Sequence, residues 1–130
     1  MKTVNILVVV DVEGALAGSL GDNVYLVDTN KHFGSSGEGQ EGLSTACRDG
    51  QLVAWNVVPV SPSNDVQIAE FTGQIINDGT CVPKLVSTPD GDYWEGRVEA
   101  RGTTGYQQYS LVLTMDGTRA TFDPWLLIKE

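Results

Sequence analysis

The sequence has little of what enzymes and metal proteins usually need. Its 130 residues include one histidine, His32, and two cysteines, Cys47 and Cys81. It has no Gly-x-Ser-x-Gly nucleophile elbow, no Cys-x-x-Cys pair and no zinc-ligand spacing. A Ser-His-Asp triad would have to use His32, which lies in a polar stretch beside Lys31 and reads as a solvated loop histidine. With no nucleophile matched to an activating base, the sequence predicts a protein that is not an enzyme.

Basic residues are also scarce, with eight Lys and Arg against 17 Asp and Glu and a net charge of −9. This balance argues against nucleic-acid binding and against anionic membranes, because both partners select basic patches. The acidity has two open interpretations, solubility or affinity for a divalent cation. In a reducing compartment, the two cysteines are expected to be free thiols with a structural role, and a disulfide between them is the alternative.

Long apolar runs are absent too. The longest, residues 6–10, has the length of a strand and not the roughly 20 residues of a membrane helix. Lys2 precedes this run, but Asp11 and Glu13 follow where a signal peptide would carry a cleavage site. We therefore expect a protein made in the cytoplasm, with no membrane insertion, whose release would need a non-classical route.

What the sequence does have is a dense series of short β-type runs separated by Asp-Gly and other glycine turns. These runs, with no convincing helix, predict an all-β fold, an antiparallel β-sandwich or jelly-roll-like single domain over residues 1–130. The Gly-rich stretch 34–42 is expected to be a long loop. The expected strands cover residues 4–10, 24–28, 43–47, 51–60, 66–76, 93–100, 106–115, 119–122 and 125–128, with a hairpin at Asp49-Gly50.

The first expected strand is apolar on both faces. Val4, Ile6, Val8, Val10 and Val12 form one row, with Asp11 at the exit of the strand, while Leu7 and Val9 lie on the other side. A run of this kind is typical of a strand that is covered on both sides. In the later strands, Trp55 and Trp94 fall on positions expected to face the core.

Two groups of oxygen-bearing side chains suggest a calcium site. Asp11 and Glu13 follow one strand, and Asp28 and Asn30 follow the next. If those strands end side by side, four hard oxygen ligands would converge on one ion. The alternative is that these side chains hydrogen-bond the backbone of their own turns. An EF-hand is excluded, because His32 occupies the fifth loop position and no glycine follows it.

Exposed aromatic and amide side chains suggest a carbohydrate site. Tyr93 is expected to face outward beside the 90–92 turn, Trp125 follows Pro124, and Asn30 supplies a loop amide. An aromatic ring covers the C–H face of a sugar while polar groups fix its hydroxyls. Ordinary core and rim packing is the alternative.

One pair of carboxylates invites an enzymatic interpretation. Glu95 and Glu99 share a strand face with Arg97 between them, and a glycosidase needs two carboxyl groups. The same alternation is typical of an exposed strand with cross-strand ion pairs, which is the interpretation we favour.

Motifs spread over nearly the whole chain resemble those of the AidA/PixA family of bacterial inclusion-body proteins. They are Ile6–Asp11, Asp22–Asn30, Asp49-Gly50-Gln51 with Trp55, Phe71–Gln74, Cys81-Val82-Pro83, Tyr93–Glu99 and Phe122-Asp123-Pro124. The resemblance implies a small bacterial protein with no defining enzymatic activity, some relatives of which accumulate as inclusions under quorum-sensing control. It therefore offers no catalytic residues.

Two functions follow from these observations. The first is a non-enzymatic, calcium-assisted carbohydrate-binding module, lectin-like, that self-associates and has glycans as partners. The second is a structural or storage inclusion-body protein, controlled by quorum sensing, with no small-molecule ligand. The net charge of −9 opposes simple stacking unless cations screen or bridge the copies.

Overall fold

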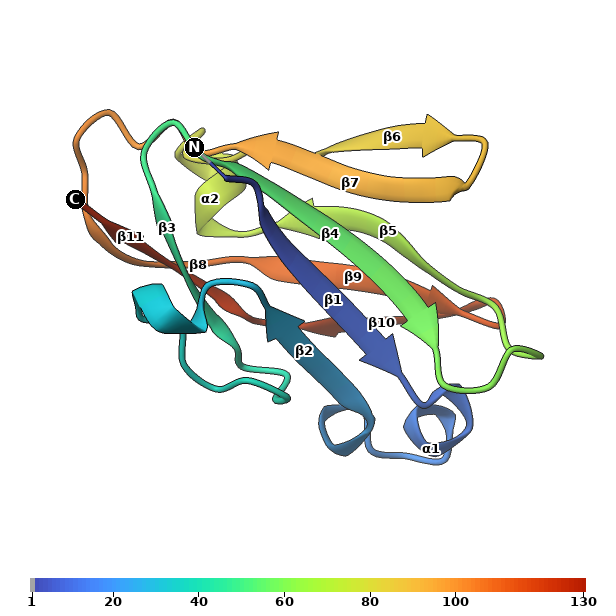
Figure 1. Cartoon of the computed structure of the whole chain (residues 1–130). Helices are drawn as coiled ribbons and strands as arrows, with labels where there is room; N and C mark the ends of the chain where they lie inside the picture. The colour runs from blue at the N-terminus through green and yellow to red at the C-terminus, as the bar shows by residue number, and fades with distance from the viewer. Residues whose placement is uncertain (1) are drawn as a thin grey trace.

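One layer of the structure is a five-stranded sheet (Figure 1), in a computed structural model that describes residues 2–130. Its strand order is β2-β1-β4-β7-β6. The strands are β1 (Val4–Val10), β2 (Val24–Asp28), β4 (Leu52–Pro59), β6 (Lys84–Thr88) and β7 (Gly91–Arg97). All neighbours in this sheet are antiparallel except β1 and β4, which run parallel.

Two three-stranded sheets lie behind it and form the second layer (Figure 1). Their strand orders are β10-β9-β5 and β3-β11-β8. The strands are β3 (Ser44–Arg48), β5 (Val66–Thr72), β8 (Gly105–Gln108), β9 (Ser110–Met115), β10 (Thr118–Phe122) and β11 (Trp125–Lys129). The predicted all-β sandwich is thereby confirmed.

The core lies between the two layers and follows from strand alternation. Val8 and Val10 of β1 are fully buried, as is Trp55 of β4. The Trp55 indole packs edge-on against Phe71 at 4.8 Å between ring centroids and donates a 3.1 Å hydrogen bond to the Tyr109 hydroxyl. Burying an indole requires a partner for its N–H, and Tyr109 supplies one from the opposite layer.

Parallel pairs and short helices depart from the sequence prediction. Besides β1 and β4, the pair β3 and β11 is parallel. The described residues also contain α1 (Val12–Leu16), α2 (Gln74–Asn77) and two 3₁₀ turns, η1 (Gly21–Asn23) and η2 (Lys31–Phe33). Asp11 starts α1 because its carboxylate accepts a hydrogen bond from the Gly14 N–H at 3.2 Å.

The predicted hairpin at Asp49-Gly50 is wrong, because β3 and β4 belong to different layers. The Asp49 carboxylate accepts hydrogen bonds from the backbone N–H groups of Ala100, at 2.8 Å, and Gly102, at 3.0 Å. The Gly50 N–H donates to the Val98 carbonyl. The turn is therefore held by the segment that follows β7, and the chain crosses between layers there.

Both cysteines are free and buried, as predicted. Burial raises the pKa of the Cys47 thiol and of the Cys81 thiol to about 12. Both side chains therefore stay protonated at neutral pH and act as small apolar core residues. The longest helix in residues 2–130, α1, has five residues, so no described helix could span a bilayer.

Candidate functional site

The residues predicted to hold calcium do not converge. In the antiparallel pair of β1 and β2, Val10 lies opposite Val24 and Ile6 opposite Asp28. The chain therefore leaves β1 toward Asp11 and Glu13 at one end of the pair, and leaves β2 toward Asp28 at the other. The expectation that these strand ends lie side by side was wrong, since it needed parallel strands. Residues 2–130 contain no group of three or more His, Cys, Asp or Glu side chains that could hold a metal ion.

Backbone hydrogen bonds account for most of these polar side chains. Asp11 caps α1, and one Asp28 oxygen accepts from the Asn30 N–H at 2.8 Å. The Asn30 amide donates to the Ala46 carbonyl at 2.7 Å and so fastens this turn to β3. Asp11 and Asp28 thus have the turn-stabilising role that was the open alternative.

The acidic side chain of Glu38, from the Gly-rich loop, lies beside Asp28. One Glu38 carboxylate oxygen accepts a hydrogen bond from the Asp28 N–H at 2.8 Å. The second oxygen of each carboxyl group is buried without a hydrogen-bond partner. Burial raises the pKa of Glu38 above its usual value; the hydrogen bond from the Asp28 N–H opposes this rise, and the nearby Asp28 carboxyl group adds to it. The pair fastens the loop to the end of β2 through one carboxyl group that retains its proton more strongly than usual.

The residues predicted to hold a ligand are likewise dispersed. Asn30 lies just before η2, Tyr93 is on β7, and Trp125 is on β11 in the second layer. Trp125 is 39% exposed and meets the 61% exposed ring of Tyr106 edge-on, with 6.3 Å between centroids. This pair lines an open surface hollow of about 320 Å³. Sequence reasoning missed Tyr106 because its partner lies on a strand that is distant in the chain.

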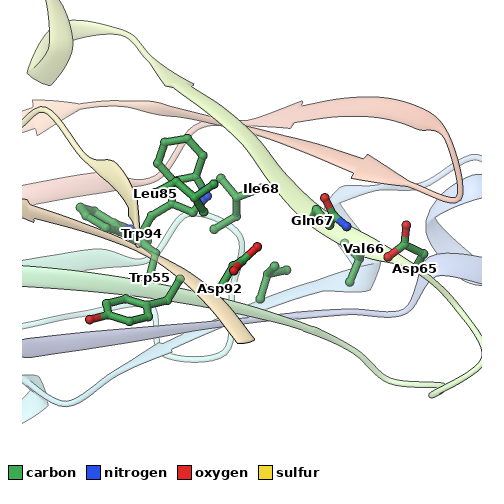
Figure 2. A pocket seen from close by; sticks show the side chains of 10 residues that line it. Trp55, Asp65, Val66, Gln67, Ile68, Leu85, Asp92 and Trp94 are labelled. Atoms are coloured by element: carbon green, nitrogen blue, oxygen red, sulfur yellow. The ribbon is translucent and has the colours of Figure 1, made fainter. Parts of the chain in front are cut away.

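A cleft opens between the layers where β6 and β7 face β5 (Figure 2). We call it the interlayer cleft; its volume is about 240 Å³. It is lined by Trp55, Val57, Asp65, Val66, Gln67, Ile68, Leu85, Asp92, Tyr93 and Trp94. Tyr93 contributes to its rim, although strand alternation directs the Tyr93 side chain away from the face that carries Trp94.

The opposite side of the five-stranded sheet is uncovered in the structure. Five apolar side chains of β1, β2 and β4 lie there, which we call the outer sheet face: Leu7, Val9, Tyr25, Val27 and Val58. They are in register in two rows, Val27 beside Leu7, and Tyr25 beside Val9 beside Val58. Four of the five are 36–42% exposed, and Val9 is half-buried. Contiguous apolar patches of this kind usually mark interaction surfaces.

Comparison with solved structures supports the predicted family resemblance at the level of the fold. An inclusion body protein (PixA) from Burkholderia cenocepacia J2315 superimposes with a TM-score of 0.72 over 98% of this chain and 94% of that chain. The two sequences are 10% identical, so the similarity shows a shared fold. No curated protein matches the sequence. A family model described as "Domain of unknown function (DUF8788)" matches residues 2–121, and the chain therefore belongs to the DUF8788 family.

Proposed function

We propose that this chain is a non-enzymatic protein that assembles with copies of itself through the outer sheet face, as a structural protein of the inclusion-body type. The observation that carries the proposal is the β1 strand. Its sequence is apolar on both sides, which is typical of a strand covered twice, yet only one side is covered within the chain. Leu7 and Val9 are the side chains left without a covering layer. A second copy would supply it.

Charge supports a second copy as the partner. The outward positions of β2, β1 and β4 carry no charged residue. The adjoining outward positions of β7 and β6 add one carboxylate, Glu95, and two cations, Arg97 and Lys84. In a chain of net charge −9, this face therefore avoids the like-charge repulsion that opposes contact elsewhere.

The area is also sufficient. The outer sheet face together with the adjoining outward positions of β7 and β6 comprises strands of 7, 5, 8, 7 and 5 residues. At about 3.3 Å per residue and about 4.8 Å between strands, the whole side presents about 500 Å² per copy, or about 1,000 Å² for two copies face to face. A specific interface needs about 1,000 Å² in total. Because the same face would meet itself, the contact would be isologous and related by a two-fold axis. The structurally similar PixA protein is described as an inclusion body protein, which fits an assembling role.

Sedimentation velocity across a range of protein and sodium chloride concentrations tests the proposal. Salt screens the repulsion between acidic copies and strengthens apolar burial, so association should increase with both concentrations. Parallel runs with calcium and with EDTA show whether calcium ions promote association by bridging copies, in addition to the screening by salt. A single 14.0 kDa species at every protein and salt concentration would rule the proposal out.

A calcium-assisted carbohydrate binder is the second candidate, favoured by the Tyr106–Trp125 pair. Two exposed rings set edge-on are suited to covering the C–H face of a sugar. A glycan array with and without calcium tests it, using Trp125→Ala and, as a control away from both this hollow and the outer sheet face, Leu16→Ala on α1. Calcium-dependent binding that Trp125→Ala removes and Leu16→Ala retains would favour this candidate. Equal signals from both variants, or none with wild type, would eliminate it.

A further inference from the structure

The interlayer cleft has an aromatic end and a polar end (Figure 2). Trp55, Trp94 and Leu85 lie together at one end, and Gln67 and Asp65 lie at the other, with Asp92 between them. The cleft persists because β5 and β6 are both edge strands of their sheets, so no further strand closes the gap between layers.

The aromatic end is held in place before any ligand arrives. Trp55 is fully buried and lies opposite Trp94 in the pairing of β4 with β7. Trp94 also packs against Phe71, with 5.4 Å between ring centroids. On its other side, Trp94 pairs with Leu85 of β6, which remains 52% exposed. A ring restrained from both sides needs little further ordering when it binds a ligand.

The charged side chains that line the cleft are all negative. Asp92 comes from the sheet that carries Trp94, and Asp65 comes from the opposite wall at the start of β5. No Lys, Arg or His lines the cleft. Within residues 2–130, neither carboxylate accepts a hydrogen bond or forms an ion pair. The backbone of Asp65 is engaged twice with Asp116: its N–H donates to the Asp116 carboxylate at 2.8 Å, and its carbonyl accepts from the Asp116 N–H at 2.9 Å. An anion would meet uncompensated negative charge here, whereas a cation would meet Asp92 between the two ends of the cleft and Asp65 at its polar end.

We propose that the interlayer cleft binds the ammonium group of a small organic cation. The positive charge would lie near Asp92, with Asp65 adding negative charge from the polar end, and its alkyl groups would contact Trp94 through cation–π and apolar contacts. The volume of about 240 Å³ suits a headgroup the size of an amino-acid side chain and is too small for a large ligand. The two carboxylates, one from each wall of the cleft, lack the ligand count for a bare divalent ion.

Titrations with choline and with 3,3-dimethylbutan-1-ol, which carries carbon in place of the charged nitrogen, test the proposal. Tryptophan fluorescence reports binding, because Trp55 and Trp94 line the cleft, and isothermal titration calorimetry gives the dissociation constants. Choline should bind about five- to thirty-fold more tightly than the neutral alcohol. Equal binding of the two, no choline binding at 50 mM, or binding of glucose in place of choline would overturn the proposal.

Charge-neutral variants locate the site. Asp92→Asn and Asp65→Asn each remove one carboxylate without changing side-chain size, and each should weaken choline binding several-fold while leaving the binding of the neutral alcohol unchanged. Asp90→Asn is the matched control, because Asp90 precedes the same strand but does not line the cleft. Melting temperatures equal to wild type show that these variants are folded. Choline binding that both cleft variants retain, or that Asp90→Asn weakens as much as they do, would contradict the assignment.

Discussion

The hydrogen bond between Trp55 and Tyr109 links the two layers, and its removal allows a quantitative test of the core. The donor and the acceptor are both fully buried, 3.1 Å apart. Tyr109→Phe removes only the hydroxyl and leaves the indole N–H without an acceptor, which should cost about 1–3 kcal/mol. Trp55→Phe also opens a cavity beside Phe71, so we expect a loss of about 2–4 kcal/mol.

The double variant separates the hydrogen bond from packing. If the bond supplies part of both losses, Trp55→Phe with Tyr109→Phe should cost about 1 kcal/mol less than the sum of the single changes. Urea unfolding followed by the fluorescence of Trp94 and Trp125 gives the three free energies. Tyr106→Phe is the control, because this tyrosine is exposed and its hydroxyl makes no hydrogen bond within residues 2–130. A loss below about 0.5 kcal/mol for Tyr109→Phe would show that this hydrogen bond does not stabilise the core.

Three further predictions concern titratable groups. Glu38→Gln should raise the melting temperature at pH 7. The pKa of Glu38 is raised in the folded protein, so the stability that its protonated form contributes is lost as pH rises above the unfolded value of 4.5. The gain in melting temperature should therefore shrink at pH 4, and a lower melting temperature at pH 7 would contradict the prediction. Asp49→Asn should destabilise the protein at pH 7 and much less at pH 2. Hydrogen bonds from Gly102 and Ala100 lower the pKa of Asp49, so the stability that its carboxylate contributes is lost as pH falls through that pKa. Equal losses of melting temperature at both pH values would exclude this role of Asp49. Ellman's reagent should label neither Cys47 nor Cys81 until urea unfolds the chain, and rapid labelling of the native protein would show that a thiol is accessible.

Local patterns in the sequence predicted the strands better than their pairing. The alternation from Val4 to Val10 is sufficient to identify β1 and its buried row. It carries no information on direction, so the parallel pairing of β1 with β4 was not predicted. The segment 106–115 reads as one strand, but Tyr109 donates its N–H to the Pro124 carbonyl, which divides β8 from β9. Contacts this distant in sequence leave no local signature.

The candidate sites show the same limit. The calcium prediction depended on the relative direction of β1 and β2, which side-chain spacing does not encode. The interlayer cleft joins Asp65 and Asp92 from different layers, so neither residue was notable in the sequence. The outer sheet face did leave a signal, because Leu7 and Val9 make β1 apolar on both sides. That signal was interpreted as burial within one chain, whereas we now propose burial between two.

The most direct test of assembly through the outer sheet face compares two charge-introducing variants by sedimentation velocity at one protein concentration. Val27→Glu places a carboxylate on this face, and Leu16→Glu places one on helix α1, away from it, at a side chain of similar exposure. If copies assemble through this face, Val27→Glu sediments as a folded monomer, whereas Leu16→Glu associates like wild type. Association of Val27→Glu equal to that of wild type would contradict it.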